Sequence, residues 1–124
     1  MFDHVQIKVN NLKKSRLFYD SIMKVLEHTI VLEIENTVIG YGKHTHNMFE
    51  IRQSNEIFHI SQNVHIALCA QNKMMVDLFY TTALKNGGFC NGKPGYRNEY
   101  EKGYYAAFII DPDGHNIEAI YKEM

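Results

Sequence analysis

The segment His4-Val5-Gln6-Ile7 returns later in the chain as His65-Ile66-Ala67-Leu68. Leu17-Phe18-Tyr19 returns as Leu78-Phe79-Tyr80, at the same offset of 61 residues (65 − 4 and 78 − 17). An acidic residue between apolar neighbours then closes each half, as Phe49-Glu50-Ile51 and as Ile117-Glu118-Ala119. Two copies of one unit, each opening on a histidine and closing on a glutamate, predict a paired architecture with a two-histidine, two-glutamate metal centre.

The composition is that of one globular domain. Of the 124 residues, 45% are hydrophobic and 22% are charged, which argues against disorder. The formal net charge is −1 and lysine and arginine form no cluster, so we expect no nucleic-acid partner. No apolar run approaches the roughly 20 residues that span a bilayer, and the N-terminus shows no signal-peptide pattern. We therefore expect a cytoplasmic protein without membrane contact.

Hydrophobic periodicity in the first half predicts a strand, a helix and three more strands. Residues 2–9 alternate between apolar and polar side chains, as a half-buried strand does. Asn11 is a suitable N-cap for a helix over residues 12–25. Three further strands are expected, over residues 28–34, 36–41 and 46–52.

The second half repeats this order. The strand that contains His65 is followed by a helix that begins after Asn72 and ends at Gly87-Gly88, where glycine accepts the left-handed backbone. Residues 91–95 contain two glycines and a proline and are expected to form a loop. A strand over 104–110, a tight turn at Asp111-Pro112-Asp113-Gly114 and a last strand over 116–121 complete the unit.

Both halves are thus βαβββ modules, and the predicted fold class is α+β. We expect a single domain over residues 1–124, with a first module at about 1–53, a linker at about 54–62 and a second module at about 63–124. Glu50 follows His4 by 46 positions, whereas Glu118 follows His65 by 53 (50 − 4 and 118 − 65). We assign the seven additional residues to the loop before Tyr104, where a segment that faces a substrate is commonly found.

Alternation places all four predicted ligands, His4, Glu50, His65 and Glu118, on the side of their strands that faces away from the core. Two imidazoles and two carboxylates suit nickel, cobalt, manganese, iron(II) or zinc, and the sequence does not choose among them. Only two cysteines occur, far apart, so a thiolate site is not expected. A single histidine or glutamate in a strand is usually solvated, but solvated residues have no reason to recur at matched positions.

Other polar residues have competing interpretations. Lys8 and Arg52 share the faces of His4 and Glu50 and are candidates to bind an anionic part of a substrate, although a surface ion pair explains Arg52 equally well. Arg97 and Tyr105 are weaker candidates for substrate binding. His115 follows the turn glycine and is expected to face solvent.

At these residues the chain resembles the vicinal oxygen chelate superfamily, which includes glyoxalase I, extradiol dioxygenases, fosfomycin-modifying enzymes and bleomycin-binding proteins. The opening Phe2-Asp3-His4-Val5 resembles the start of its first module. Phe108-Ile109-Ile110-Asp111-Pro112-Asp113-Gly114-His115-Asn116-Ile117-Glu118 resembles its most recognisable signature. The resemblance spans essentially the whole chain. It implies that the paired modules form a curved, incomplete barrel around a divalent metal ion.

The resemblance also implies a function. His4, Glu50, His65 and Glu118 match the four ligands of glyoxalase I-like members, which favours a metal-dependent lyase or isomerase for a small substrate with adjacent oxygens, acting through a metal-stabilised enediolate. Glu118 is the first choice for the catalytic base and Glu50 the second. Lys8 stands where bacterial glyoxalase I has an arginine that contacts the glutathione carboxylate. Lysine keeps the charge but loses the bidentate geometry.

Two other functions within the superfamily remain open. One is a non-haem metal dioxygenase that uses three of the four ligands, and the other is a drug-binding resistance protein without chemistry. The resemblance further implies a homodimer, because glyoxalase members often build the centre from modules of two chains.

Overall fold

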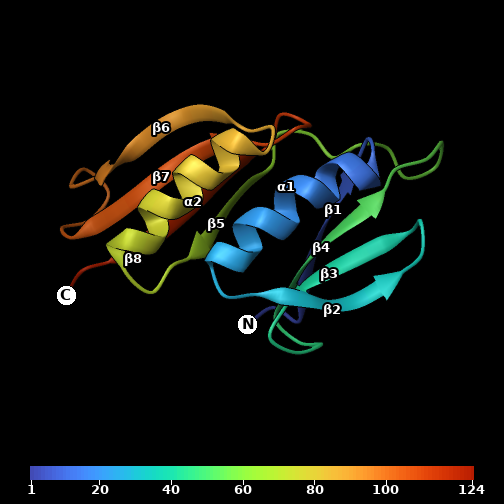
Figure 1. Ribbon diagram of the computed structural model, residues 1–124, viewed down its shortest axis with the longest axis horizontal. Helices are drawn as coiled ribbons and strands as arrows, with labels where there is room; N and C mark the ends of the chain where they lie inside the picture. The colour runs from blue at the N-terminus through green and yellow to red at the C-terminus, as the bar shows by residue number, and fades with distance from the viewer.

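The structure is a computed structural model that describes all 124 residues, and it contains two copies of one βαβββ unit (Figure 1). The first unit consists of β1 (His4–Val9), α1 (Leu12–Val25), β2 (Thr29–Ile34), β3 (Val38–Gly42) and β4 (Met48–Gln53). The second unit consists of β5 (His65–Cys69), α2 (Lys73–Lys85), β6 (Phe89–Tyr96), β7 (Tyr104–Ile110) and β8 (Asn116–Lys122). The predicted α+β fold of two such modules is therefore confirmed.

Each module folds into its own four-stranded sheet, with strand order β1-β4-β3-β2 in the first and β5-β8-β7-β6 in the second. The first strand of each module pairs in parallel with the last, and the other neighbours are antiparallel. A parallel pair needs a long crossover connection, which the helix and the two intervening strands provide. The two sheets remain separate and do not close into one barrel.

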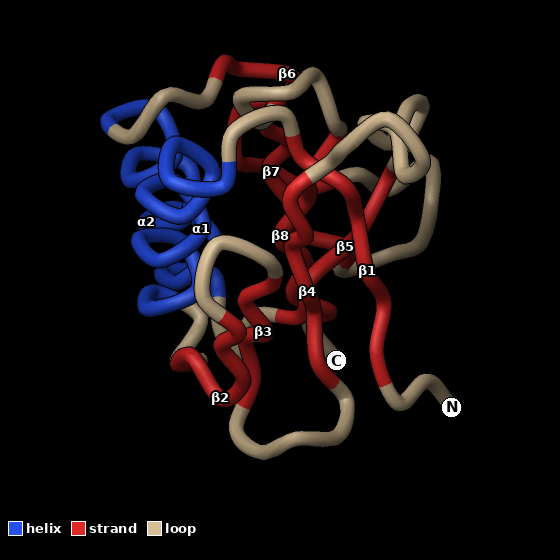
Figure 2. The backbone as a smooth tube through the Cα atoms, turned by 90° about the vertical axis from the view of Figure 1, so that its right-hand side faces the viewer, coloured by secondary structure: helices blue, strands red, loops and turns tan.

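Both helices lie on the same side of the sheets, as Figure 2 shows. One core cluster of 20 buried residues lies between the helices and the sheets. It includes Phe18 and Tyr19 of α1, Phe79 of α2, Ile51 of β4 and Ile117 of β8. Because this core is shared, neither module buries its apolar surface alone. We call the opposite side of each sheet, where no helix packs, the helix-free face. Neither helix is both long and apolar enough to cross a membrane.

Equivalent asparagines begin the two helices. The side chain of Asn11 accepts a hydrogen bond from Lys14 N at 3.1 Å, and that of Asn72 accepts one from Met75 N at 2.8 Å. Each bond satisfies one of the backbone donors that a helix start leaves without a partner. The predicted caps are therefore confirmed in both modules.

The segment Asn91–Gly95 differs from the expectation, because it belongs to β6 and not to a loop. β6 is the edge strand of the second sheet, where Pro94 can direct its missing donor away from the ladder. Its register to β7 shifts between Cys90 and Gly92 and again between Gly92 and Gly95. A bulged edge strand thus accepts the glycines and the proline that suggested a loop. The connection from β6 to β7, residues 97–103, is longer than the three-residue connection from β2 to β3.

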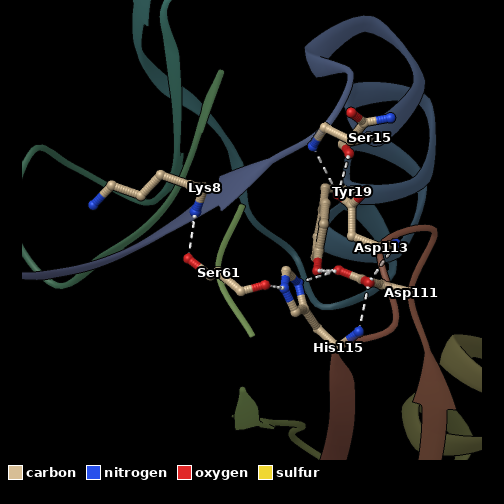
Figure 3. A network of polar contacts seen from close by, with 8 residues as sticks. Lys8, Ser15, Tyr19, Ser61, Asp111, Asp113 and His115 are labelled. Atoms are coloured by element: carbon tan, nitrogen blue, oxygen red, sulfur yellow. Dashed lines mark hydrogen bonds and ion pairs between the residues drawn. The ribbon is translucent and has the colours of Figure 1, made fainter. Parts of the chain in front are cut away.

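A buried polar network joins the two modules at the turn before β8 (Figure 3). Asp111 of that turn accepts hydrogen bonds from the Tyr19 hydroxyl at 2.5 Å and from the His115 backbone N–H at 2.8 Å. The His115 ring contacts Asp111 through Nδ1 at 3.0 Å and the Ser61 carbonyl oxygen through Nε2 at 2.7 Å. Ser61 in turn pairs with the backbone of Lys8 on β1. The network therefore ties α1, the segment before β5 and β1 to the second module.

The expectation that His115 faces solvent is wrong, because this residue is only 1% exposed. Burial acts to raise the pKa of Asp111, but hydrogen bonds from His115 and Tyr19 outweigh it and hold that pKa below its ordinary value. Burial acts to lower the pKa of His115, but its bonds to Asp111 and to Ser61 outweigh it and raise that pKa. The two shifts favour an ion pair at the centre of the network.

Candidate metal centre

The four predicted ligands form two matched pairs on the helix-free faces. In the parallel pair β1–β4, Gln6 lies opposite Glu50, so His4 stands two positions before the glutamate in register. In the pair β5–β8, Ala67 lies opposite Glu118, so His65 stands two positions before it as well. Side chains two positions apart on a strand share one face. Each module therefore presents one histidine and one glutamate with the same geometry, and we call each such pair a half-site.

The half-site of the second module is closed by direct contact. His65 Nε2 lies 2.8 Å from Glu118 Oε1, and the Tyr104 hydroxyl donates a hydrogen bond to Glu118 Oε2. Glu118 is 2% exposed, whereas the side chain of His65 is 54% exposed. Burial and the bond to Glu118 together raise the pKa of Tyr104 well above its ordinary value, so its hydroxyl stays protonated and donates. Glu118 is therefore a buried carboxylate with a contact on each oxygen, and the imidazole of His65 is the accessible member of the pair.

The half-site of the first module has different contacts. Glu50, which is 5% exposed, accepts a hydrogen bond at Oε1 from Gln6 Nε2 at 2.9 Å. His4 contacts Asp3 through Nδ1 at 2.7 Å, and the other oxygen of Asp3 contacts His46 Nδ1 at 2.9 Å. The hydrogen bond to Asp3, followed by the charge of Glu50, raises the pKa of His4. Asp3 therefore orients the His4 ring and leaves its Nε2 without a hydrogen bond.

Within one chain the two half-sites stay separate. No three histidine, cysteine, aspartate or glutamate side chains gather in a geometry that holds a metal ion. The chemistry of the four side chains fits a divalent ion of the iron-to-zinc series, because each half-site offers one imidazole and one carboxylate. A single chain thus supplies two ligands at each of two places.

Two predicted substrate-binding residues lie side by side next to the first half-site. Lys8 and Arg52 are register partners on β1 and β4. They follow Gln6 and Glu50 by two positions and therefore lie on the same face. Both cations approach the ring of Phe58, with Lys8 Nζ 6.0 Å and Arg52 Cζ 5.3 Å from its centroid. Neither forms an ion pair, and Arg52 Nε is buried without a hydrogen-bond partner. The surface ion pair considered for Arg52 is therefore absent.

The position of Phe58 is fixed by the chain around it. The side chain of Asn55 accepts hydrogen bonds from Ile57 N at 2.8 Å and from Phe58 N at 2.7 Å. At the end of the same segment, Ser61 N donates to Lys8 O at 3.0 Å and Ser61 Oγ accepts from Lys8 N at 2.8 Å. The segment between the modules is thus fastened to β1, and it holds an aromatic ring over two unpaired cations.

Arg97 and Tyr105, the other predicted substrate contacts, lie on opposite sides of the second sheet. Arg97 Cζ lies 5.4 Å from the ring of Phe108, which is the register partner of Glu118. Arg97 is thus near the second half-site. Tyr105 packs against the main core and donates to Asp77 of α2 at 2.6 Å, so it lies on the helix side. Its neighbour Tyr104 occupies the helix-free face instead.

The sequence interpretation missed several residues that surround the half-sites: Asp3, Gln6, Phe58, Tyr104 and Phe108. Strand alternation from Glu118 across the β7–β8 pair would have identified Phe108 and Tyr104, had the register of that pair been known. The sequence carried no signal for Phe58, because its place depends on the path of the segment between the modules.

Several solved structures are similar to this chain over nearly its whole length. The chain is similar over 99% of its length to a glyoxalase/bleomycin resistance protein from Albidiferax ferrireducens T118, with 27% identity, a TM-score of 0.84 and 99% of that chain covered. A putative glyoxalase from Bacillus halodurans matches with 20% identity and a TM-score of 0.74, over 97% of this chain and 94% of that one. A V278E mutant of glyoxalase I from Zea mays matches with 16% identity and a TM-score of 0.70, over 97% of this chain and 45% of that one.

Matching against protein-family models and against curated protein sequences gives no result. The similar solved structures nevertheless point to one group of proteins, because glyoxalase, bleomycin resistance and dioxygenase proteins recur among them. They confirm the resemblance to the vicinal oxygen chelate superfamily that the sequence motifs indicated. The lower identities establish the fold alone.

Proposed function

Because the chain has the fold of the glyoxalase, bleomycin resistance and dioxygenase proteins, we propose that it is a metal-dependent lyase or isomerase of the glyoxalase type. The observation that carries this proposal is the recurrence of one histidine and one buried glutamate at the same register position of both modules. A structural role would not require that recurrence. A protein that only binds a drug would not require ligands that suit a metal ion.

The ion would be held by His4, Glu50, His65 and Glu118. When bound, a divalent ion supplies Lewis acidity, which polarises two adjacent substrate oxygens and makes the neighbouring C–H more acidic. A carboxylate on the helix-free face then accepts that proton and returns it to the adjacent carbon, as general base and general acid in turn. Glu50 and Glu118 are the two residues available for this step. Both are nearly buried, and exclusion of water strengthens their interaction with the reacting atoms.

We further propose that the complete centre forms in a homodimer. The two half-sites of one chain do not meet. A twofold axis that brings the first module of one chain against the second module of its partner generates two identical four-ligand centres. An isologous interface repeats every contact, so both centres form together.

The substrate we propose carries a negative charge. Lys8 and Arg52 are the cations without ion pairs beside the first half-site, and Phe58 gives that place an apolar wall. Arg97, above Phe108, is the matching cation near the second half-site. A substrate with vicinal oxygens at one end and a carboxylate or a phosphate at the other fits this arrangement, because arginine and lysine bind such groups through charge-assisted hydrogen bonds.

The first test is the metal content of the purified protein and of two variants. Elemental analysis should find about one ion per chain, and His65→Ala or Glu118→Ala should remove it while circular dichroism shows a retained fold. His59→Ala is a matched control, because His59 is exposed and its ring forms no hydrogen bond. Unchanged metal content in both ligand variants would refute the assignment.

The second test is activity. Methylglyoxal combined with several thiols, and anionic α-hydroxycarbonyl compounds without a thiol, should be assayed with added nickel, cobalt, manganese or zinc. We expect turnover that depends on the ion and is absent in Glu118→Ala. Oxygen consumption with a catechol and iron(II), without any isomerase activity, would instead identify a dioxygenase.

A further inference from the structure

The two carboxylates occupy equivalent positions but are held differently. Glu50 accepts one hydrogen bond, from Gln6, and its Oε2 accepts none. Glu118 contacts His65 at Oε1 and accepts the Tyr104 hydroxyl at Oε2. Ala67 stands at the position in the second module that Gln6 occupies in the first. The amide donor has therefore been replaced by a phenol that comes from a different strand.

The first module has no counterpart of Tyr104. Gly40 on β3 is the register partner of Glu50, as Phe108 on β7 is the partner of Glu118. Tyr104 precedes Phe108 by four positions and is the first residue of β7. The residue four positions before Gly40 is Asn36, which lies in the turn before β3 with a positive φ of 58°. The first module therefore has no strand residue at this place that could reach Glu50.

The surroundings of Tyr104 fix its position. Its side chain packs against a small buried cluster of Ala106, Phe108 and Ile120 on the helix-free face. The ring of Tyr100 meets it edge-on, with centroids 5.3 Å apart and an interplanar angle of 80°. The residue before it, Gly103, has a φ of 82° and approaches the Glu123 carbonyl so closely that a Cβ would lie 2.2 Å from that oxygen. Only glycine fits there, so the backbone that starts β7 is set.

We propose that Tyr104 is a positioning residue that fixes Glu118 as a ligand through one oxygen, and that Glu50 is consequently the carboxylate that moves the proton. This inference rests on the proposed function and assigns roles to its two glutamates. With Oε2 held by the phenol, Glu118 offers only Oε1, the oxygen beside His65. Glu50 has an oxygen without a hydrogen bond and no anchoring hydroxyl. It can therefore change its contacts during a reaction at lower cost.

The decisive variant is Tyr104→Phe, which removes one hydroxyl and keeps the ring. Residues that orient a metal ligand typically contribute about 10- to 100-fold to affinity. We expect the dissociation constant for Co²⁺ or Zn²⁺, measured by competition with a chromophoric chelator, to rise about tenfold or more. The visible absorption spectrum of the Co²⁺ form should also change, because Glu118 becomes free to bind through both oxygens. Tyr100→Phe is the matched control, since the Tyr100 hydroxyl forms no hydrogen bond, and its affinity and spectrum should equal those of the unmodified protein.

The division of roles has its own test. Glu50→Gln and Glu118→Gln are compared at saturating metal, with affinity and kcat measured separately. We expect Glu118→Gln to weaken metal binding more and Glu50→Gln to lower kcat more. The opposite pattern, or a Tyr104→Phe affinity within about twofold of the unmodified value, would overturn it. An unmodified protein that binds no ion would overturn the proposed function itself, so the two failures are distinguishable.

Discussion

The first and second modules each present one histidine and one glutamate, the proposed metal ligands, yet different side chains hold these residues in place. In the first module, Glu50 is held by an amide and His4 by the exposed carboxylate of Asp3. In the second, Glu118 is held by a phenol, and the turn that leads to it is locked by the buried pair of Asp111 and His115. Register fixes the positions of the proposed ligands in both modules. The residues behind them differ, and the glutamate of the second module has more polar contacts than that of the first.

The largest expected effect is on stability, and it comes from the turns that precede β4 and β8. Asp111→Asn breaks a buried, hydrogen-bonded ion pair and should lower the free energy of unfolding by about 3–5 kcal/mol. His46→Ala, in the corresponding region of the first module, alters an exposed side chain and should change stability by less than about 0.5 kcal/mol. Urea denaturation of both variants measures the difference. Equal effects would show that the buried pair contributes no more to stability than the exposed contact of the first module.

Substitutions of the cations beside the two half-sites should differ less in their effects than the substitutions in the two turns. Arg52→Gln removes a charge next to the first half-site and should raise KM for an anionic substrate by about 10- to 100-fold, as the loss of a charge-assisted hydrogen bond predicts. Arg97→Gln should have a smaller effect, because its guanidinium already donates to the Lys93 carbonyl. Steady-state kinetics with a neutral analogue serves as the control. If that analogue is affected equally, the arginines do not recognise charge.

The buried pair also predicts a pH dependence of stability. The pKa of Asp111 is lowered by folding, so its contribution is present above about pH 4 and is lost as the pH falls through its folded pKa. The pKa of His115 is raised by folding, so its contribution is complete below about pH 6.5 and is lost as the pH rises through its folded pKa. Tyr19 and Asp113 are the other titratable groups of this network.

The stability difference between the unmodified protein and His115→Gln should therefore be larger at about pH 5 than at about pH 8. Thermal unfolding across this range measures it. A difference that is constant with pH would show that the pair is not ionised in the folded protein.

The smallest expected effect lies at His4. Asp3→Asn removes the carboxylate that raises the pKa of this ring, so that pKa should fall towards its ordinary value. NMR titration of the His4 ring measures the change. An unchanged His4 titration would show that Asp3 does not hold the His4 ring.

The sequence was sufficient to predict the modules and the strand faces on which the four predicted ligands lie. Both follow from the two-residue period of a strand, and the repeat supplies the alignment that a single strand lacks. The α1 bounds and both helix caps follow from local rules in the same way. These features depend on neighbours along the chain, which the sequence displays directly.

Features that depend on distant segments were not predictable. Residues 91–95 form an edge strand because β7 is available beside them, although their glycines and proline suggest a loop. His115 is buried because Tyr19 and Ser61, far away in the sequence, close over it. Tyr104, and not the predicted Tyr105, faces Glu118 because the pairing of β7 with β8 sets which tyrosine lies on the helix-free face. The separation of the half-sites within one chain likewise depends on how the modules pack.

The central claim is that each metal centre joins the first half-site of one chain to the second half-site of another. It is tested most directly with two double variants, His4→Ala/Glu50→Ala and His65→Ala/Glu118→Ala, which should each bind no ion alone. Heterodimers of the two, isolated with different affinity tags, keep one intact pairing of half-sites across the interface. The account predicts about one ion per heterodimer, with activity restored in proportion. Heterodimers that bind no ion, while unmodified dimers bind two, would contradict it.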